Sequence, residues 1–430
     1  MTKFFRLLAI IVLVVWLTVS ALAQTATGPS SLPLTQDSGV LTLEAATEQF
    51  MRRNLALEAA RLEVGVAGTE RISARLFPRP GLTVSAENLR VSGPTQFNNL
   101  YEVGVTVAQP IELGNRRERR AELAERTVAV AEAQLTDVLR RRLFELRRTY
   151  YETILARTIL NIERENRDNF AELVRFNTVR FEEGYIAEGE LLRVRLERVK
   201  YDSTIAQATL ALRQSNVRLL ELLGETDYGR AAMLDVAGTL EIRDTTLDLE
   251  QLRRTALANR PDIKVAEAEV ARAESVFQLE RSRAKGEITP FVGYRKVGRD
   301  NTALAGVTVP LPFGNRNQGG IARAEAERRV TETNLLLTRN RALAEVESAY
   351  RAYETAREQV KAYETGLLKQ ADESRDIQLA AYREGVVELI TLLDAQRTRS
   401  EVRVNYYRAL FDYQTSIFQL ELATGVDIKQ

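Results

Sequence analysis

The chain has 430 residues, 45% of them hydrophobic and 28% charged, and its 60 basic and 59 acidic side chains nearly cancel. It contains no cysteine and no histidine, which excludes disulfides, a structural zinc site, a cysteine nucleophile and a histidine base. The chain has no excess of basic residues that would indicate nucleic acid as a partner. A large and balanced charged fraction is typical of long solvated helices.

The N-terminus predicts an export signal over residues 1–23, followed by a linker over 24–40. Lys3 and Arg6 form a positive end, residues 7–19 are apolar, and the small residues at 21–23 form a cleavage site. No cysteine follows that site, so we expect no lipid anchor there. No later apolar run reaches the length of a membrane-spanning helix, so any membrane crossing must be made of strands.

The rest of the chain contains one unit twice. The segment Pro110–Arg116 recurs as Pro310–Arg316 after a shift of 200 residues, and the shift becomes 201 where Phe181–Gly184 matches Tyr382–Gly385. Asn54 and Asn259 match more loosely. Chance similarity between two helical domains is disfavoured, because turn residues recur at equal spacing. We assign the copies to 41–224 and 250–425, with a linker over 225–249 and a tail over 426–430.

Each copy predicts a helix, two strands, a very long helix, a turn and a return helix. In the first copy these cover 42–76, 81–91, 100–111, about 116–179 and 188–223. In the second copy they cover 256–285, 288–297, 303–310, 321–382 and 388–423. The long helix of the first copy would span about 95 Å, which requires a coiled coil or a stacked array. Its expected packing seam is Leu139, Leu143, Leu146, Tyr150 and Ile154.

The four strands alternate apolar and polar residues. Each is about 8–12 residues long, which is enough for a tilted strand to cross a membrane. Four strands alone would leave unpaired edges in lipid. Several chains must therefore share one barrel, and three chains would give 12 strands. The helices would continue that barrel as a hollow cylinder. The alternative is a soluble coiled-coil stalk that carries two exposed hairpins.

Three features together resemble the TolC family of outer-membrane efflux proteins: the repeated unit, the Pro-x-x-x-Gly-Asn-Arg strand exit, and the run from Tyr-Arg-Glu-Gly to Leu-Leu-Asp-Ala-Gln at 382–396. The resemblance covers roughly residues 40–427, and residues 309–319 look most like its CzcC-type heavy-metal branch. It implies a mainly α fold with membrane β: a homotrimeric 12-stranded β-barrel in the outer membrane, continued by an α-helical tunnel in the periplasm. It also implies a periplasmic adaptor and an inner-membrane pump of the RND type.

The two helix turns at Gly184 and Gly385 are the first candidate site. Glycine just past a helix allows a turn with positive φ, and this alone explains both residues. The family resemblance adds that these tips receive the adaptor.

Asp394 is the second candidate, because the family's matching acid faces the lumen. Three copies would form a negative ring that attracts cations. Thr391 stands where the family often has a second acid, and Arg193 is the counterpart of Asp394 in the first copy. The alternative is an ordinary surface acid paired with Arg397 or Thr398 one turn on.

The strand-to-helix junctions are the third candidate site. They contain Arg116 and Arg316, and we expect them to shape the bend between barrel and tunnel without any chemistry. The candidate junction residues are Pro110, Gly114, Asn115, Pro310, Gly314 and Asn315.

The leading function is a passive outer-membrane duct for an energised efflux pump, with heavy-metal cations as candidate cargo. A related duct for drugs or secreted proteins, and an envelope-spanning scaffold without transport, stay open as alternatives. An enzyme is disfavoured because no paired carboxylates are spaced for acid–base work. No phosphate-binding loop is present, and we expect no cofactor and no resident metal.

Overall fold

The computed structural model describes residues 40–89, 92, 94, 101–242, 247–311 and 313–428. The predicted export signal and nearly all of the following linker lie outside these residues. So do the end of the strand predicted over 81–91, the start of the strand predicted over 100–111, and the end of the C-terminal tail. Residues from Val40 onward form one compact unit. None of the helices in the described ranges combines the length and the apolar character that a membrane span requires.

The first copy begins with two helices, α2 (Leu43–Arg53) and α3 (Leu55–Arg75), where the sequence predicted one. Asn54 separates them with an extended backbone, and its side-chain oxygen accepts a hydrogen bond from the backbone N–H of Leu57. This is an N-cap. The prediction of an unbroken helix over 42–76 was wrong because asparagine was treated as an ordinary helical residue.

The remaining elements of the first copy follow the predicted order. They are the strands β2 (Gly81–Glu87), β3 (Glu102–Ala108) and β4 (Ile111–Glu112), the 67-residue helix α4 (Arg116–Glu182) and the return helix α5 (Glu188–Leu222). The linker was predicted to be irregular, but it contains a short 3-10 helix, η2 (Tyr228–Ala232), and the strand β5 (Asp235–Val236). Strand β5 pairs in parallel with β1 (Val40–Leu41).

The second copy also begins with two helices, α6 (Leu249–Asn259) and α7 (Pro261–Arg283). Pro261 is the first residue of α7, where its missing N–H is not needed, and Arg260 before it leaves the helical conformation. The single helix predicted over 256–285 was therefore wrong. The later elements are β6 (Glu287–Val297), β7 (Asp300–Thr308), α8 (Gln318–Ala362), α9 (Leu368–Arg383) and α10 (Leu389–Thr424).

The long helix predicted over 321–382 is confirmed, since α8, a π-helical turn η3 (Tyr363–Leu367) and α9 follow one another without a gap. The π-turn was not predicted. The N–H of Leu368 donates to the carbonyl of Tyr363, five residues back. A π-turn contains one residue more than an α-turn. The repeat shift grows from 200 to 201 between Tyr350 and Tyr382, and η3 is where the additional residue is accommodated. Helix α4 passes the corresponding level without interruption.

In both copies the break between the two short helices is clamped by the end of the return helix. Asn54 Nδ2 donates to the carbonyl of Leu222 at 2.8 Å, and Arg260 Nη1 donates to the carbonyl of Ala423 at 3.0 Å. Arg260 is 2% exposed and also pairs with Asp262 and Glu345. The structural counterpart of Asn54 is therefore Arg260, and not the neighbouring Asn259 that the sequence suggested.

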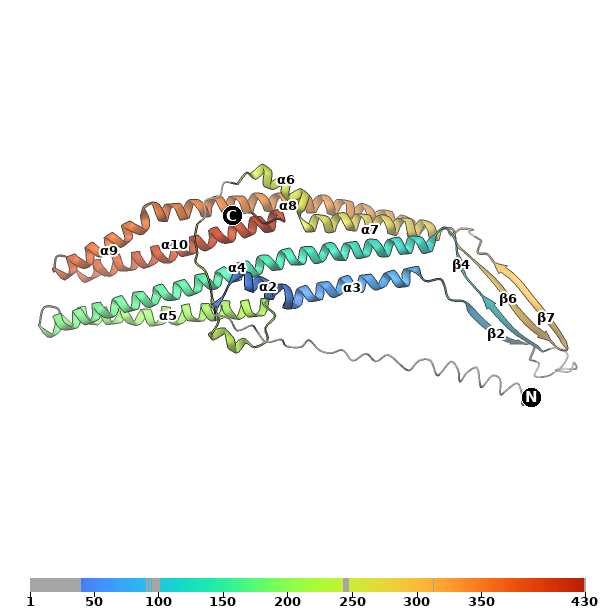
Figure 1. Cartoon of the computed structure of the whole chain (residues 1–430), viewed down its shortest axis with the longest axis horizontal. Helices are drawn as coiled ribbons and strands as arrows, with labels where there is room; N and C mark the ends of the chain where they lie inside the picture. Colours follow the sequence, from blue (N-terminus) through green and yellow to red (C-terminus); the bar gives the residue numbers. More distant parts are fainter. Residues whose placement is uncertain are drawn as a thin grey trace. The chain divides into compact units, whose positions relative to one another are not determined.

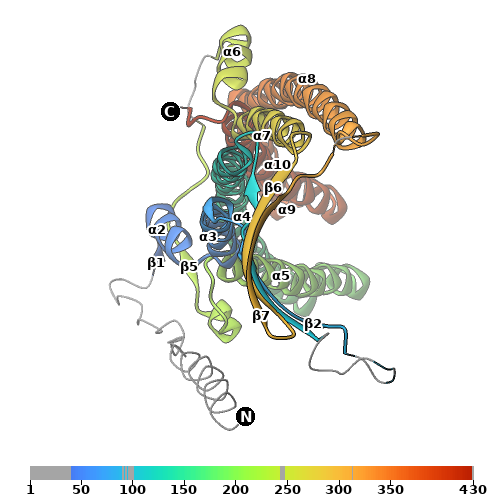
Figure 2. The same cartoon turned by 90° about the vertical axis from the view of Figure 1, so that its right-hand side faces the viewer.

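Helix α4 lies between α3 and α7, and α8 packs on the other side of α7 (Figures 1 and 2). Beyond this row, α4 pairs with α5 and α10 pairs with α9 as two helical hairpins. The predicted seam is confirmed, because Leu146, Tyr150 and Ile154 are buried in the main core and the two leucines before them pack against it. A second, smaller apolar cluster lies between the two hairpins, near their turns.

The strands form an antiparallel sheet in the order β2-β3-β6-β7, with β4 paired to the start of β6. The register sets Val84, Val105, Tyr294 and Ala303 in one row across the sheet, and Leu82, Val107, Val292 and Ala305 in the next. All these residues share one face. The strands lie at the end of the helices opposite to the hairpin turns (Figure 1).

Candidate functional site

Both hairpin turns have the same backbone structure. Gly184 and Gly385 have φ values of +80° and +76°. At each turn the glycine N–H bonds three residues back and the next residue's N–H bonds five residues back, from Tyr185 to Arg180 and from Val386 to Ala381. This is the Schellman pattern that ends helices. Tyr185 is 72% exposed and Val386 is 77% exposed, so each turn presents an apolar side chain outward.

Tyr382 connects the two hairpins, a role that the sequence reasoning did not predict. Its ring is 2% exposed in the cluster between the hairpins. Its hydroxyl lies within hydrogen-bonding distance of Asn177 Oδ1 on α4 and, at 2.8 Å, of Glu190 Oε1 on α5. Its repeat counterpart, Phe181, is 38% exposed and has no hydroxyl. That difference between the copies was the only available signal.

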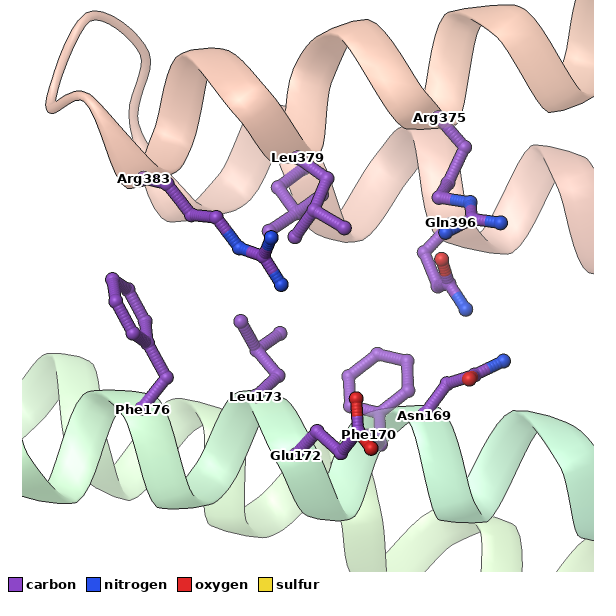
Figure 3. Close-up of a pocket in the computed structure, with 10 residues that line it drawn as sticks. Asn169, Phe170, Glu172, Leu173, Phe176, Arg375, Leu379, Arg383 and Gln396 are labelled. Carbon is purple, nitrogen blue, oxygen red and sulfur yellow. The ribbon is translucent and has the colours of Figure 1, made fainter.

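A cavity of about 90 Å³ lies between α4 and the second hairpin (Figure 3). Phe170 and Leu173 of α4 face Leu379 of α9 across it, and the guanidinium groups of Arg375 and Arg383 border it (Figure 3). The apolar contact between the hairpins is therefore incomplete at this level.

Asp394 lies on the exposed surface of α10, one residue after the buried pair Leu392 and Leu393. The alternative of a local ion pair is not seen: within the described ranges Arg397 pairs with Glu197 on α5, at 3.8 Å, and the carboxylate of Asp394 has no partner. Arg193, its repeat counterpart on α5, is also exposed.

The first strand-to-helix junction is tightly fitted. Gly114 has φ +76°, and a Cβ there would lie 2.6 Å from Lys285 Cδ. Asn115 follows in the left-handed conformation directly before α4. Arg116 donates to the carbonyl of Gly286 at 2.9 Å, where α7 gives way to β6. The side chain of Gln109 bonds the carbonyl of Pro110. This junction thus ties the first copy to the start of the second sheet segment.

The second junction is built differently from its sequence match. Pro310 is exposed, and Gly314 has φ +79° with open space around it. The left-handed asparagine directly before α8 is Asn317, and not Asn315. Asn315 Oδ1 instead accepts the N–H of Asn317, whose Nδ2 donates to Glu280 on α7. Gap-free alignment missed Asn317 because the second junction is two residues longer.

These features define the class of the protein: a duplicated set of helical hairpins joined to a four-stranded antiparallel sheet. The same fold occurs in CusC, whose crystal structures describe transmembrane channel formation, with a TM-score of 0.75 at 19% identity over 95% of this chain and 99% of that chain.

The chain belongs to the outer membrane efflux protein family, whose model matches residues 46–225 and 252–426. It is 27% identical to the cobalt-zinc-cadmium resistance protein CzcC of Cupriavidus metallidurans over 91% of this chain and 92% of that protein. It is also 26% identical to the nickel and cobalt resistance protein CnrC of the same species over 72% of this chain and 70% of that protein. The predicted family and the outer-membrane efflux class are thereby confirmed.

Proposed function

We propose that this protein is the outer-membrane channel of a pump assembly that exports heavy-metal cations. The observation that carries the proposal is the similarity to CzcC along nearly the whole length of both chains. The chain's own role is passive conduction. No group of three or more acidic side chains in the described ranges is arranged to hold a metal ion, and a duct that releases cations quickly needs no such group.

A homotrimer is supported by the edges of the single chain. Strands β2 and β7 stand at the two ends of the sheet order, with one backbone edge unpaired within the described residues. Helices α3 and α8 stand at the two ends of the helix row, and both carry exposed apolar side chains, among them Leu62, Val66, Leu336 and Leu337. Unpaired strand edges and apolar helix faces require a neighbour. Further copies of the chain supply it, and three copies close a 12-stranded barrel.

The sheet's apolar face is suited to lipid. Leu82, Val84, Val292 and Val307 are each more than half exposed on it. The opposite face carries polar residues, including Ser85, Arg295 and Thr302 in one row across the sheet. Alternation of this kind is what a strand with lipid on one side and water on the other requires. The helices then extend into the periplasm, away from the membrane.

The hairpin turns at Gly184 and Gly385 are the docking points for a periplasmic adaptor, which joins the channel to an inner-membrane pump of the RND type. Their support is the outward position of Tyr185 and Val386 in two turns of matching structure. Asp394 contributes a ring of three carboxylates to the lumen near these turns. Its support is an exposed carboxylate without a partner among the described residues.

The cargo is tested by deleting the gene and measuring growth with zinc, cobalt, cadmium, nickel and a panel of drugs. We expect sensitivity to metals and unchanged tolerance of drugs, restored by the intact gene. A deletion strain that is sensitive to drugs but not to metals would show that the cargo is drugs and not metal cations.

The channel itself is tested in planar bilayers with the purified protein, where we expect discrete conductance steps. Asp394→Asn should lower the preference for cations, measured as a smaller reversal potential in a salt gradient. Asp376→Asn is the matched control, because Asp376 is an exposed acid of α9 that already pairs with Arg375. Equal changes in reversal potential for the two substitutions would show that Asp394 does not line the lumen.

A further inference from the structure

We propose that the cavity between α4 and the second hairpin binds one small monovalent anion, for which chloride is the abundant candidate. The groups that hold the anion are the guanidinium groups of Arg375 and Arg383 and the side-chain amide of Gln396. The inference depends neither on the cargo nor on conduction.

Side chains with hydrogen-bond donors enter the cavity from α9 and α10. Figure 3 shows the guanidinium groups of Arg375 and Arg383 and the amide of Gln396 pointing toward α4. Gln396 is 8% exposed, and neither it nor Arg383 has a hydrogen-bond or ion-pair partner in the described ranges. The Nε atom of Arg375 is buried and has no acceptor among the same residues. Buried donors are normally paired, and an anion is an acceptor that several donors can share.

The neighbouring carboxylates do not supply that acceptor. Three of them pair with arginines: Glu165 with Arg403 at 2.8 Å, Asp372 with Arg399 at 2.6 Å and Asp376 with Nη1 of Arg375 at 3.1 Å. Glu172 lines the cavity from α4, and it is exposed. The lining therefore has two guanidinium groups against one carboxylate, and this positive balance favours an anion.

The rest of the lining is apolar, which determines the kind of anion. Phe170 and Leu392 are 3% and 2% exposed, and Leu173 and Leu379 pack beside them. An anion that binds here loses part of its water shell, and this costs most for small or doubly charged anions. A cavity of about 90 Å³ has room for only a few particles the size of a water molecule. Bromide and chloride should therefore bind better than fluoride and sulfate.

The site belongs to the second copy of the repeat. The positions that correspond to Arg375 and Arg383 in the first copy are Val174 and Glu182. The repeat therefore does not reproduce the two guanidinium groups, and we expect one anion per chain.

The proposal is tested with the purified full-length protein in detergent by chlorine-35 NMR, in which exchange with a bound site broadens the chloride line. We expect broadening that depends on the protein and saturates as chloride is raised. Arg375→Gln combined with Arg383→Gln should reduce the excess linewidth by about threefold or more. The matched control is Arg323→Gln combined with Arg329→Gln, because these arginines of α8 are 80% and 72% exposed. Helical circular dichroism checks that each variant is folded.

A second variant tests the site without removing a donor. Glu172→Gln removes the opposing carboxylate from an exposed position and should lower the chloride concentration at half-saturation by about threefold. Glu325→Gln, on α8, is the control and should leave that concentration unchanged.

Three results would overturn the proposal. Native protein that gives no protein-dependent broadening binds no chloride. Broadening that survives both arginine substitutions, or a half-saturation that Glu172→Gln does not change, places the chloride elsewhere. Competition at constant ionic strength tests the apolar lining, since bromide should displace chloride and fluoride should not. Equal displacement by the two would contradict the role of the apolar walls.

Discussion

The hydroxyl oxygen of Tyr382, in the last turn of α9, lies 2.8 Å from Oε1 of Glu190, in the first turn of α5. The two residues belong to different copies of the repeat. Burial raises the pKa of Tyr382, and the hydrogen bond to Glu190 raises it further, so the phenol stays protonated. Its one proton can be donated to Glu190 or to Asn177, and the contact holds the two hairpins together near their turns.

Tyr382→Phe should therefore weaken the contact between the two hairpins near their turns. It should leave no cavity in the apolar cluster, because the ring is kept and only the hydroxyl is lost. Removing one partner of a buried hydrogen bond costs about 1–3 kcal/mol. Hydrogen exchange should speed up in residues 170–200 and 375–395 and stay constant elsewhere. Tyr185→Phe is the control, since Tyr185 is 72% exposed. Unchanged exchange in the Tyr382 variant would show that the hydroxyl contributes nothing to the contact.

Arg260→Met should destabilise the whole protein. The Arg260 side chain is 2% exposed, pairs with Asp262 and Glu345, and donates to the Ala423 carbonyl. Its loss leaves partly buried acceptors without a donor, which should lower the free energy of unfolding by about 3 kcal/mol. The measurement is the midpoint of urea unfolding, which should fall. Arg323→Met removes a cation that is 80% exposed and should leave the midpoint in place. Equal midpoints for both variants would contradict the importance of the buried network.

The same network predicts a loss of stability in acid. Burial alone would raise the pKa of Asp262, but the hydrogen bonds and charge of Arg260, with Arg140, outweigh it and hold the pKa below its ordinary value. The folded state therefore binds this proton less readily than the unfolded state. The contribution is complete above about pH 4 and is lost as the pH falls through the lowered folded value. Urea unfolding between pH 2 and pH 7 should show this dependence in the native protein and a weaker one in Arg260→Met.

Gly224→Ala should be severely destabilising. Gly224 has φ +73°, and a Cβ there would lie 2.2 Å from the carbonyl oxygen of Arg53. Steric overlap and left-handed strain together should cost more than about 2 kcal/mol. Gly68→Ala is the opposite case, because Gly68 lies within α3 with open space around it. That change should stabilise by about 0.5–1 kcal/mol. Thermal unfolding of both variants checks the pair.

Deleting Gly366 should restore an unbroken helix and turn α9 by about 100° about its axis. Tyr382 would then leave the contact with Asn177 and Glu190, and the second hairpin should become sensitive to protease between residues 369 and 388. Replacing the deleted residue with alanine restores the residue count and should restore protection. Full protection in the deletion variant would show that η3 does not set the rotation of α9.

The errors in the predicted fold have a common origin. The breaks at Asn54 and Arg260 and the π-turn η3 each depend on one or two residues within strongly periodic segments. The left-handed Asn317 likewise depends on two added residues, in the junction before α8. Periodicity is averaged over several turns, so it detects a helix but not a single change of direction within it. The one-residue change in repeat shift was visible in the sequence, although its structural meaning was not.

The duplication, the strands, the long helices and their turns could be predicted from the sequence, because each is encoded by local patterns of apolar residues, glycine and proline. The family could be predicted as well, through motifs that span both copies. The contacts between distant residues could not be predicted: Tyr382 with Glu190 and Arg116 with Gly286 across the copies, and Arg260 with Ala423 within the second copy. Such contacts depend on how the elements are rotated and placed against one another, and η3 shows that one added residue is enough to change that rotation.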